Sequence, residues 1–141
     1  MILHAGLISL ARRGVLITGP PGAGKSDLAL RALEAGFQLV ADDRTIVWTS
    51  AGRLFGRAPP AIAGLIEARG LDIVRTTFLP LVEIVLVCAC VETVERLPEP
   101  GSETILGLAV PRIEIRPLEA SAPAKLRYAL SGLESAAKER I

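Results

Sequence analysis

The alternation of apolar and polar positions predicts strands with few helices between them. Residues 3–10 and 14–18 are short apolar runs on either side of an ARRG turn, which is typical of paired strands. Residues 26–35 instead carry apolar side chains at helical spacing, and Gly36 follows as a stop signal. The chain is therefore expected to begin with two strands and one helix.

The rest of the chain again predicts mainly strands. Apolar runs predict five strands in the middle of the sequence, at residues 38–43, 45–49, 53–58, 71–78 and 82–91. The flanking segments predict a short helix from the two prolines at 59 and 60 through Ile66, a polar loop at 96–104, β-like segments at 105–110 and 112–118, and an amphipathic helix at 123–140. This pattern predicts one α/β domain over residues 1–141, built on a mixed sheet with hairpins instead of regular βαβαβ layering.

Composition and charge exclude several classes of protein. The chain has 141 residues and is half apolar, which suits a single core. Its 16 basic and 15 acidic side chains form no run of one sign, so we expect no nucleic-acid partner. The basic pair at residues 12–13 follows the first apolar segment, unlike in a signal peptide, and the apolar run at 79–91 is too short to span a membrane. We therefore expect a soluble, cytoplasmic protein that does not contact membranes.

Two cysteines, Cys88 and Cys90, lie in one apolar run. Strand spacing would place both thiols on the same face. Their spacing does not fit a CxxC redox or zinc pattern, and the chain has no second pair. We expect small, reduced core side chains.

The sequence GVLITGPPGAGKSDLAL, residues 14–30, contains the pattern GxxxxGK[ST] between a predicted strand and a predicted helix. Glycines let the backbone wrap a phosphate, and the amides of the loop and of the helix N-terminus point at the anion. Lys25 would neutralise the outer phosphates, and Ser26 would offer an oxygen to Mg²⁺. We therefore predict a P-loop whose cofactor-binding residues are Gly19, Pro20, Pro21, Gly22, Ala23, Gly24, Lys25 and Ser26.

A P-loop does not identify the phosphate acceptor, because switch proteins, ATPases and kinases share it. Asp42 and Asp43 end the next predicted strand, where a metal-holding acid is expected. One carboxylate suffices for Mg²⁺, and the second could take a proton from an attacking hydroxyl, as a kinase requires. No guanine-reading NKxD segment and no Arg-rich lid follow. The residues favour a kinase over a switch protein or a small nucleotide kinase.

These residues, together with HAG at 4–6, LVADDRTIV at 39–47, APPAI at 58–62, LIEARGLDIV at 65–74, ERLPEPGSET at 95–104 and VPRIEI at 110–115, resemble the kinase domain of bacterial HPr kinase/phosphorylase. That family is itself similar in its P-loop core to phosphoenolpyruvate carboxykinase. The resemblance implies an ATP- and Mg²⁺-dependent protein kinase that phosphorylates a serine of the phosphocarrier HPr, or of a nitrogen-type homologue, and so regulates the phosphotransferase system. Many members also remove this phosphate with inorganic phosphate, and many form homo-oligomers, commonly hexamers.

The resemblance also implies roles for individual residues. It places Lys25 and Ser26 on the phosphates and the metal, and it makes one of the adjacent aspartates the acid/base; we favour Asp43, with Asp42 as its partner. Glu67 matches an acid near the metal, and Arg69 follows it in the signature segment. The full expected set is His4, Lys25, Asp42, Asp43 and Arg96 as catalytic residues, with Ser26, Asp43 and Glu67 at the metal.

Several positions depart from the family pattern. Asp27 stands where the family usually has Glu, and Asp72 and Arg75 replace part of a glycine-rich segment. These changes bear mainly on the reverse reaction, for which the resemblance implies a role of Arg96. Because nothing in the sequence matches the family's N-terminal domain, we expect a short form that lacks it. Two alternatives remain open at this point: a small-molecule kinase related to phosphoenolpyruvate carboxykinase, and a nucleotide-binding sensor without transfer activity.

Overall fold

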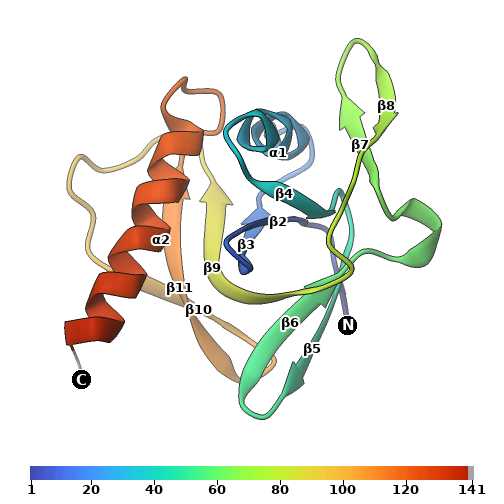
Figure 1. Cartoon of the computed structure of the whole chain (residues 1–141). Coiled ribbons are helices and arrows are strands. Elements are labelled where there is room, and N and C mark those ends of the chain that lie inside the picture. The colour runs from blue at the N-terminus through green and yellow to red at the C-terminus, as the bar shows by residue number, and fades with distance from the viewer. Residues whose placement is uncertain (140–141) are drawn as a thin grey trace.

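The structure, a computed structural model, describes residues 1–139 and the side chains of residues 1–133. It contains a large curled sheet, a separate two-stranded hairpin and two α-helices (Figure 1). In chain order the elements are β1 (Ile2–Leu3), β2 (Gly6–Leu10), β3 (Arg13–Thr18), α1 (Lys25–Glu34), β4 (Gln38–Ala41), β5 (Thr45–Ser50), β6 (Arg53–Arg57), the 3₁₀ turn η1 (Pro60–Ile62), β7 (Leu65–Ala68), β8 (Asp72–Arg75), β9 (Val82–Cys90), β10 (Gly101–Ile105), β11 (Leu108–Ile115) and α2 (Ala122–Glu139).

The sheet is mixed, as predicted, and β9 is its central strand. The strands run in the order β1-β5-β6-β9-β3-β2-β4, while β11 pairs with β9 and β10 pairs with β11. β9 lies parallel to β3 and β11 and antiparallel to β6. β6 pairs with the start of β9, and β11 pairs with the end of β9. The sheet therefore divides into two branches along β9 and curls.

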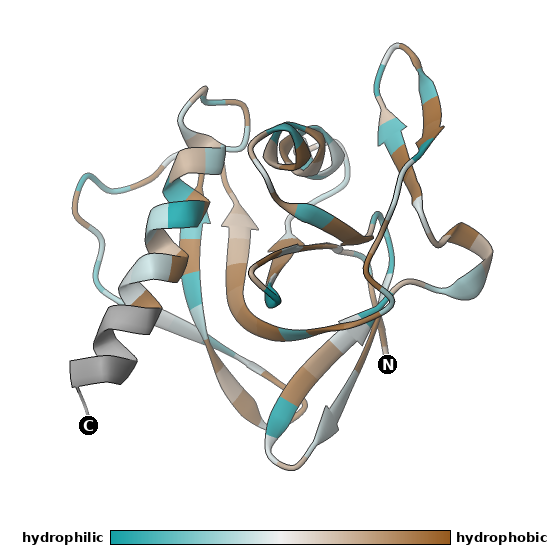
Figure 2. Ribbon diagram, viewed as in Figure 1, coloured by the Kyte–Doolittle hydropathy of each residue, from teal (hydrophilic) through white to brown (hydrophobic). Residues whose placement is uncertain are grey.

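The sheet buries both of its faces. On one face, Val15, Ile17, Leu86 and Cys88 pack against α1 and α2. On the opposite face, a second core lies inside the curl, where Leu16 contributes from β3. Burial on both faces explains why residues 14–17 of β3 and 84–90 of β9 are continuous apolar runs instead of alternating ones. Figure 2 shows that these central strands are largely hydrophobic.

Most predicted elements are confirmed. The first helix lies within one residue of its predicted bounds, and the hairpin formed by β5 and β6 turns at the predicted residues 51–52. The last helix also forms, with Leu126 and Leu130 buried and Leu133 packed at the edge of the core; Arg140 lies outside the described residues.

Several predicted boundaries are wrong. The β-like segments predicted at 105–110 and 112–118 are instead a turn at 106–107 and the single strand β11, which ends before residue 116. The strand predicted at 3–10 is interrupted at His4 and Ala5, between β1 and β2. The helix predicted from residue 59 through Ile66 is only the turn η1, because Gly64 adopts a φ of 78° and β7 begins at Leu65. The predicted loop at 96–104 ends early, since residues 101–104 belong to β10, a largely exposed strand whose polar side chains give no apolar alternation.

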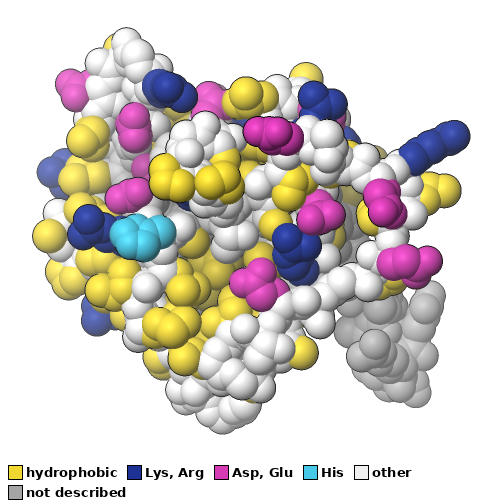
Figure 3. Space-filling model, turned by 180° about the vertical axis from the view of Figure 1, so that it is seen from behind, with side chains coloured by type: hydrophobic (Ala, Val, Ile, Leu, Met, Phe, Trp, Pro, Cys, Tyr) yellow, Lys and Arg dark blue, Asp and Glu magenta, His cyan; other side chains and the backbone are white. Residues whose placement is uncertain are grey.

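Within residues 1–139, no helix is long and apolar enough to cross a membrane. The face shown in Figure 3 carries interspersed acidic and basic side chains, and the single histidine of the chain is exposed on it.

Candidate active site

The predicted P-loop connects β3 to α1 beside the centre of the sheet. Gly22 and Gly24 adopt φ values of 78° and 101°, in the left-handed region that favours glycine, so the backbone can curl ahead of α1. Lys25 Nζ donates hydrogen bonds to the carbonyl oxygens of Gly19, at 2.7 Å, and Pro20, at 3.1 Å. The two loop carbonyl groups therefore hold the ammonium group of Lys25 beside the place where a phosphate would bind.

A chain of hydrogen bonds connects the P-loop to the adjacent strand end and to the small hairpin. Ser26 Oγ donates to Asp42 Oδ1 at 2.8 Å. The backbone N–H of Glu67, on β7, donates to Asp42 Oδ2 at 3.0 Å. Because Asp42 follows β4 and is only 6% exposed, its carboxylate acts as a fixed acceptor between three segments that are far apart in the sequence.

The environment of Asp42 shifts its acidity. Burial raises the pKa of this carboxyl above its usual value of 3.8, and the neighbouring charge of Asp43 adds to the increase. The hydrogen bonds from the Glu67 amide and from Ser26 lower the pKa, but they do not cancel the effect of burial. Desolvation therefore dominates at this residue.

Asp43 differs from Asp42 in exposure and in backbone conformation. Its side chain is 74% exposed, and its backbone adopts a φ of 69°, which is uncommon for a residue other than glycine. Asp43 lines a cavity of about 480 Å³ together with Pro21, Gly22, Gly24, Lys25, Ser26, Asp27, Glu67, Arg69 and Leu118. The structure thus brings most of the predicted site residues to one cavity, with Asp42 behind its wall.

A second cavity of about 850 Å³ adjoins the other side of the P-loop. It is lined by residues 20–23, by the end of β9 through Glu92, and by residues 116–119. Leu118, 74% exposed, lines both cavities and lies so close to Gly24 that a Cβ there would be 3.2 Å from its Cδ2. Nothing in the sequence pattern singled out this segment.

Arg31 holds the segment of residues 116–119 against α1. Its guanidinium donates to Asp27 Oδ2 at 2.9 Å, to the carbonyl oxygen of Glu119 at 3.0 Å, and to that of Pro117. Asp27, the shorter acid noted in the sequence, thus pairs with Arg31 within α1 while also lining the 480 Å³ cavity. The spacing of four residues between Asp27 and Arg31 is the one sequence signal that could have indicated this arrangement.

Besides Asp42, two further predicted catalytic residues, His4 and Arg96, line neither cavity. His4 is exposed between β1 and β2, two residues before Gly6, at which a Cβ would lie 3.9 Å from Asp42 Oδ1. Arg96 is exposed in the segment between β9 and β10. Among the described residues, no group of three His, Cys, Asp or Glu side chains is placed to hold a metal ion.

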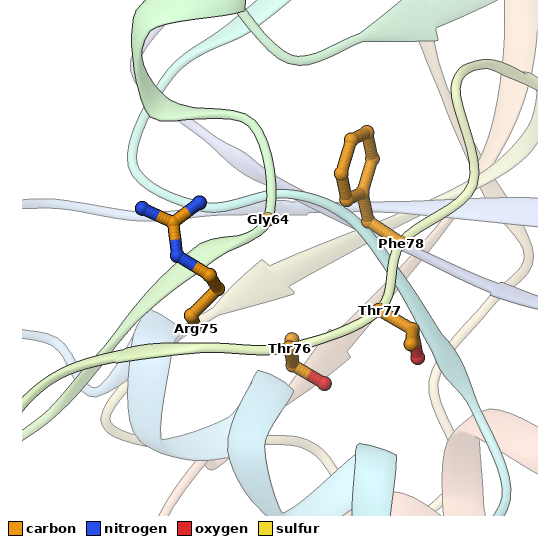
Figure 4. Close-up of a pocket in the computed structure, with 5 residues that line it drawn as sticks. All are labelled: Gly64, Arg75, Thr76, Thr77 and Phe78. Carbon is orange, nitrogen blue, oxygen red and sulfur yellow. The ribbon is translucent and has the colours of Figure 1, made fainter.

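The altered signature segment forms the hairpin of β7 and β8, which extends from the body in Figure 1. Asp72 lies in this hairpin, where its carboxylate accepts the Ile73 N–H at 2.7 Å. A third cavity, of about 560 Å³, is lined by Gly64, Arg75, Thr76, Thr77 and Phe78. Figure 4 shows the Arg75 and Phe78 side chains flanking Gly64, while both threonine hydroxyls point the other way. This cavity shares no lining residue with the two at the P-loop.

Comparisons with known proteins agree with this geometry. The family described as HPr Serine kinase C-terminal domain matches residues 1–125. The chain is 42% identical over 77 residues to an HPr kinase/phosphorylase of Clostridium beijerinckii, covering 55% of this chain and 26% of that protein. It is 35% identical over 128 residues to one from Limosilactobacillus reuteri, covering 80% of this chain and 40% of that protein.

The chain thus spans well under half the length of these curated relatives. A solved structure, of the Hpr(Ser) kinase/phosphatase from Coxiella burnetii, matches with a TM-score of 0.85 and 26% identity, covering 98% of this chain and 99% of that one. The curled mixed sheet with its P-loop is therefore the fold of that enzyme. By its sequence and its structure, the chain belongs to the HPr Serine kinase C-terminal domain family.

Proposed function

We propose that this domain is an ATP- and Mg²⁺-dependent protein serine kinase that phosphorylates the phosphocarrier HPr, or a nitrogen-type homologue, and thereby regulates the phosphotransferase system. The observation that carries the proposal is the connection from Ser26 through Asp42 to the Glu67 amide. It gathers the P-loop hydroxyl, a buried carboxylate and the β7–β8 hairpin around one cavity. Family membership supports HPr as the acceptor, because the matched relatives are named HPr kinase/phosphorylase.

The P-loop would bind the phosphates of the nucleotide. The amides at the start of α1 and the helix dipole favour an anion at this point. Lys25 would exchange the carbonyl oxygens of Gly19 and Pro20 for phosphate oxygens, at little cost, because all of these partners lie at the same loop. The chain thereby neutralises and orients the group to be transferred.

The residues of the 480 Å³ cavity fit a bound Mg²⁺. This ion usually binds one or two carboxylates together with substrate phosphates and waters. Ser26, Asp43 and Glu67 line the cavity and would hold the ion; Ser26 Oγ, which donates its proton to Asp42, keeps its lone pairs available. When bound, Mg²⁺ would supply charge neutralisation at the phosphates.

The two aspartates would have different roles, proton transfer for Asp43 and positioning for Asp42. Asp43 faces the cavity and is exposed, so its carboxylate can reach the hydroxyl of an incoming seryl side chain and accept its proton. Asp42 is occupied by Ser26 and by the Glu67 amide, and so acts as a positioning residue. This division supports Asp43 as the acid/base and Asp42 as its partner.

We further propose that the same site catalyses the reverse reaction, in which inorganic phosphate removes the phosphoryl group from seryl-phosphorylated HPr. The matched relatives are named kinase/phosphorylase and kinase/phosphatase. The family resemblance assigns Arg96 to this phosphate and His4 to the active site. Both lie on exposed segments, from which they could approach a substrate protein.

The test of the kinase is incubation with γ-labelled ATP, Mg²⁺ and a panel of phosphocarrier proteins, followed by identification of the labelled residue. We expect label on a serine of one carrier. Asp43→Asn should lower the rate by about 10² to 10⁴ while nucleotide binding persists, and Asp72→Asn, an exposed carboxylate outside the P-loop cavities, should have no effect. Failure of every carrier to accept label, or a near-normal rate for Asp43→Asn, would contradict the proposal.

A further inference from the structure

Cys90 lies at the base of the P-loop. β9 runs parallel to β3, with Cys88 opposite Ile17 and Ala89 opposite Thr18, so the end of β9 reaches the point where the P-loop begins. A Cβ at Gly19 would lie 3.0 Å from Cys90 Cβ and 3.2 Å from its carbonyl oxygen. Cys90 is only 4% exposed, and it lines the 850 Å³ cavity together with Pro20, Pro21 and Ala23. Cys90 is thus part of the wall of the space beside the phosphate loop.

The two thiols of β9 are not equivalent. Both face the core that contains α1 and α2, and a hydrogen bond joins them. This hydrogen bond, followed by burial, raises the pKa of the fully buried Cys88. The same bond lowers the pKa of Cys90, and the charge of Lys25 lowers it further, against the opposing effect of burial. Cys90 is therefore the thiol that ionises first, with Cys88 as its hydrogen-bond donor.

We propose that Cys90 is an oxidation site at which a peroxide closes the P-loop to nucleotide. The inference rests on the nucleotide site of the proposed function. In the reaction, the Cys90 thiolate attacks one oxygen of hydrogen peroxide, an S–O bond forms, the O–O bond breaks, and hydroxide leaves. The hydroxide combines with the proton that the thiol released on ionising, so water is the second product. The sulfur loses two electrons to the peroxide and becomes a sulfenic acid.

Cys88 would donate a hydrogen bond to the sulfenic acid of Cys90 more readily than it would form a disulfide with Cys90. Positions two apart on a strand are separated by about 6.6 Å between Cα atoms, close to the upper limit for a disulfide. The Cys90 Cβ would lie only 3.0 Å from a Cβ at Gly19, so an oxygen added to the neighbouring sulfur would crowd the base of the P-loop. It would also offer an acceptor to Lys25, whose charge already acts on this thiol. Both effects oppose the binding of phosphates.

Bound nucleotide should protect the thiol. A nucleotide held by the P-loop would cover the cavity wall and would offset the charge of Lys25 that favours the thiolate. With nucleotide at about 100 times its Kd, only about 1% of the protein has a free site, so oxidation should slow by about two orders of magnitude. Protection by nucleotide can be measured on the unmodified chain and requires no variant.

The experiment treats the full chain with hydrogen peroxide and a sulfenic-acid-trapping 1,3-dione, with and without ATP and Mg²⁺. Peptide mass mapping locates the adduct, and a fluorescent ATP analogue reports nucleotide binding. We expect the adduct on Cys90, slower formation with ATP, and nucleotide affinity weakened about tenfold or more after oxidation without the dione, with recovery after dithiothreitol. Cys90→Ser should bind nucleotide and resist peroxide, whereas Cys88→Ala, which lacks the donor, should form the Cys90 adduct more slowly.

Three results would overturn the inference: no adduct on Cys90, adduct formation that ignores nucleotide, or oxidised protein that binds nucleotide as well as untreated protein does. These outcomes differ from failure of the proposed function. If untreated chain does not bind nucleotide, the P-loop assignment itself is wrong. If untreated chain binds nucleotide and oxidation leaves binding unchanged, only the role of Cys90 is refuted.

Discussion

Replacing Asp42 with asparagine should separate the two roles of this buried carboxylate, which are to join three segments and to orient Ser26. The two side chains have nearly the same shape. The amide oxygen can accept the Glu67 N–H, now at 3.0 Å from Asp42 Oδ2. The amide nitrogen would then face Ser26 Oγ, at present 2.8 Å from Oδ1, and donate to it. Both hydrogen bonds survive, but the one to Ser26 changes direction.

The stability cost should be small for asparagine and large for alanine. Asp42→Asn replaces two charge-assisted hydrogen bonds with neutral ones, a loss of about 1 kcal/mol each, and it removes a charge whose burial already raises the pKa. These effects oppose each other, so we expect a change within about 1 kcal/mol. Asp42→Ala leaves the Glu67 N–H and the Ser26 hydroxyl without this acceptor, which should cost about 2–5 kcal/mol in total.

The pH dependence of the free energy of unfolding is an independent test of the raised pKa of Asp42. Because the pKa of Asp42 is raised above 3.8 in the folded state, the folded chain binds this proton more tightly than the unfolded chain does. The stabilisation from this proton is complete below the unfolded pKa and is lost as pH rises through the folded pKa. Wild type should therefore lose stability relative to Asp42→Asn over that acidic window, and the difference should be constant above it.

Urea unfolding of wild type and both variants, from about pH 3 to about pH 7, measures these quantities. Turnover with HPr reports on the orientation of Ser26. Asp42→Asn should lose about 10² or more in turnover, because Ser26 would then point its proton, and no longer its lone pairs, at the Mg²⁺ that it would hold. An asparagine variant as unstable as the alanine variant would refute the hydrogen-bond account. An asparagine variant with normal turnover would refute the orientation of Ser26.

Three further predictions address the nucleotide and the reverse reaction. Gly22→Ala and Gly52→Ala should each destabilise the fold by about 1–2 kcal/mol, because both positions have left-handed φ values, of 78° and 75°. A Cβ would meet no neighbouring atom at either position, so the backbone strain is the same kind of effect in both variants. Only Gly22→Ala, at the P-loop, should weaken binding of a fluorescent ATP analogue. Lys25→Ala should abolish tight ATP binding in calorimetry while far-UV circular dichroism stays unchanged, and normal affinity in a folded variant would contradict its role. Arg96→Ala should reduce phosphate-dependent dephosphorylation of HPr more than the kinase rate, measured on one preparation with phosphate titrated from zero; equal losses would argue against a selective role.

The sequence predicted the elements that carry a local signal. The P-loop and α1 were recognisable because glycines, Lys25 and the helical stripe lie within a few residues of each other, and the strand before Asp42 is an uninterrupted apolar run. Local signals failed to predict β10, whose polar side chains are mostly exposed. They also extended the predicted helix through Ile66, although Gly64 ends the turn and β7 begins at Leu65. Local periodicity cannot show pairing at an edge or a single residue with positive φ.

The connections across the site had no such signal. The partnership of Asp42 with the Glu67 amide uses a backbone group, which any residue type could supply. The placement of Leu118 over Gly24 depends on where β11 ends. The two aspartates were predicted together, but their division into a buried and an exposed carboxylate follows from the left-handed backbone at Asp43, which the sequence does not specify.

The pairing of β3 with β9 has a consequence for the time course of folding. The P-loop follows β3 early in the chain, but its base is built by β9, which is reached only after α1 and the strands β4 through β8. Contacts between segments so distant in sequence form slowly, because the intervening chain must first be ordered. During synthesis, the phosphate-binding loop would therefore remain incomplete until β9 has emerged, so a nascent chain should gain affinity for ATP late and abruptly, when Cys90 docks beneath Gly19.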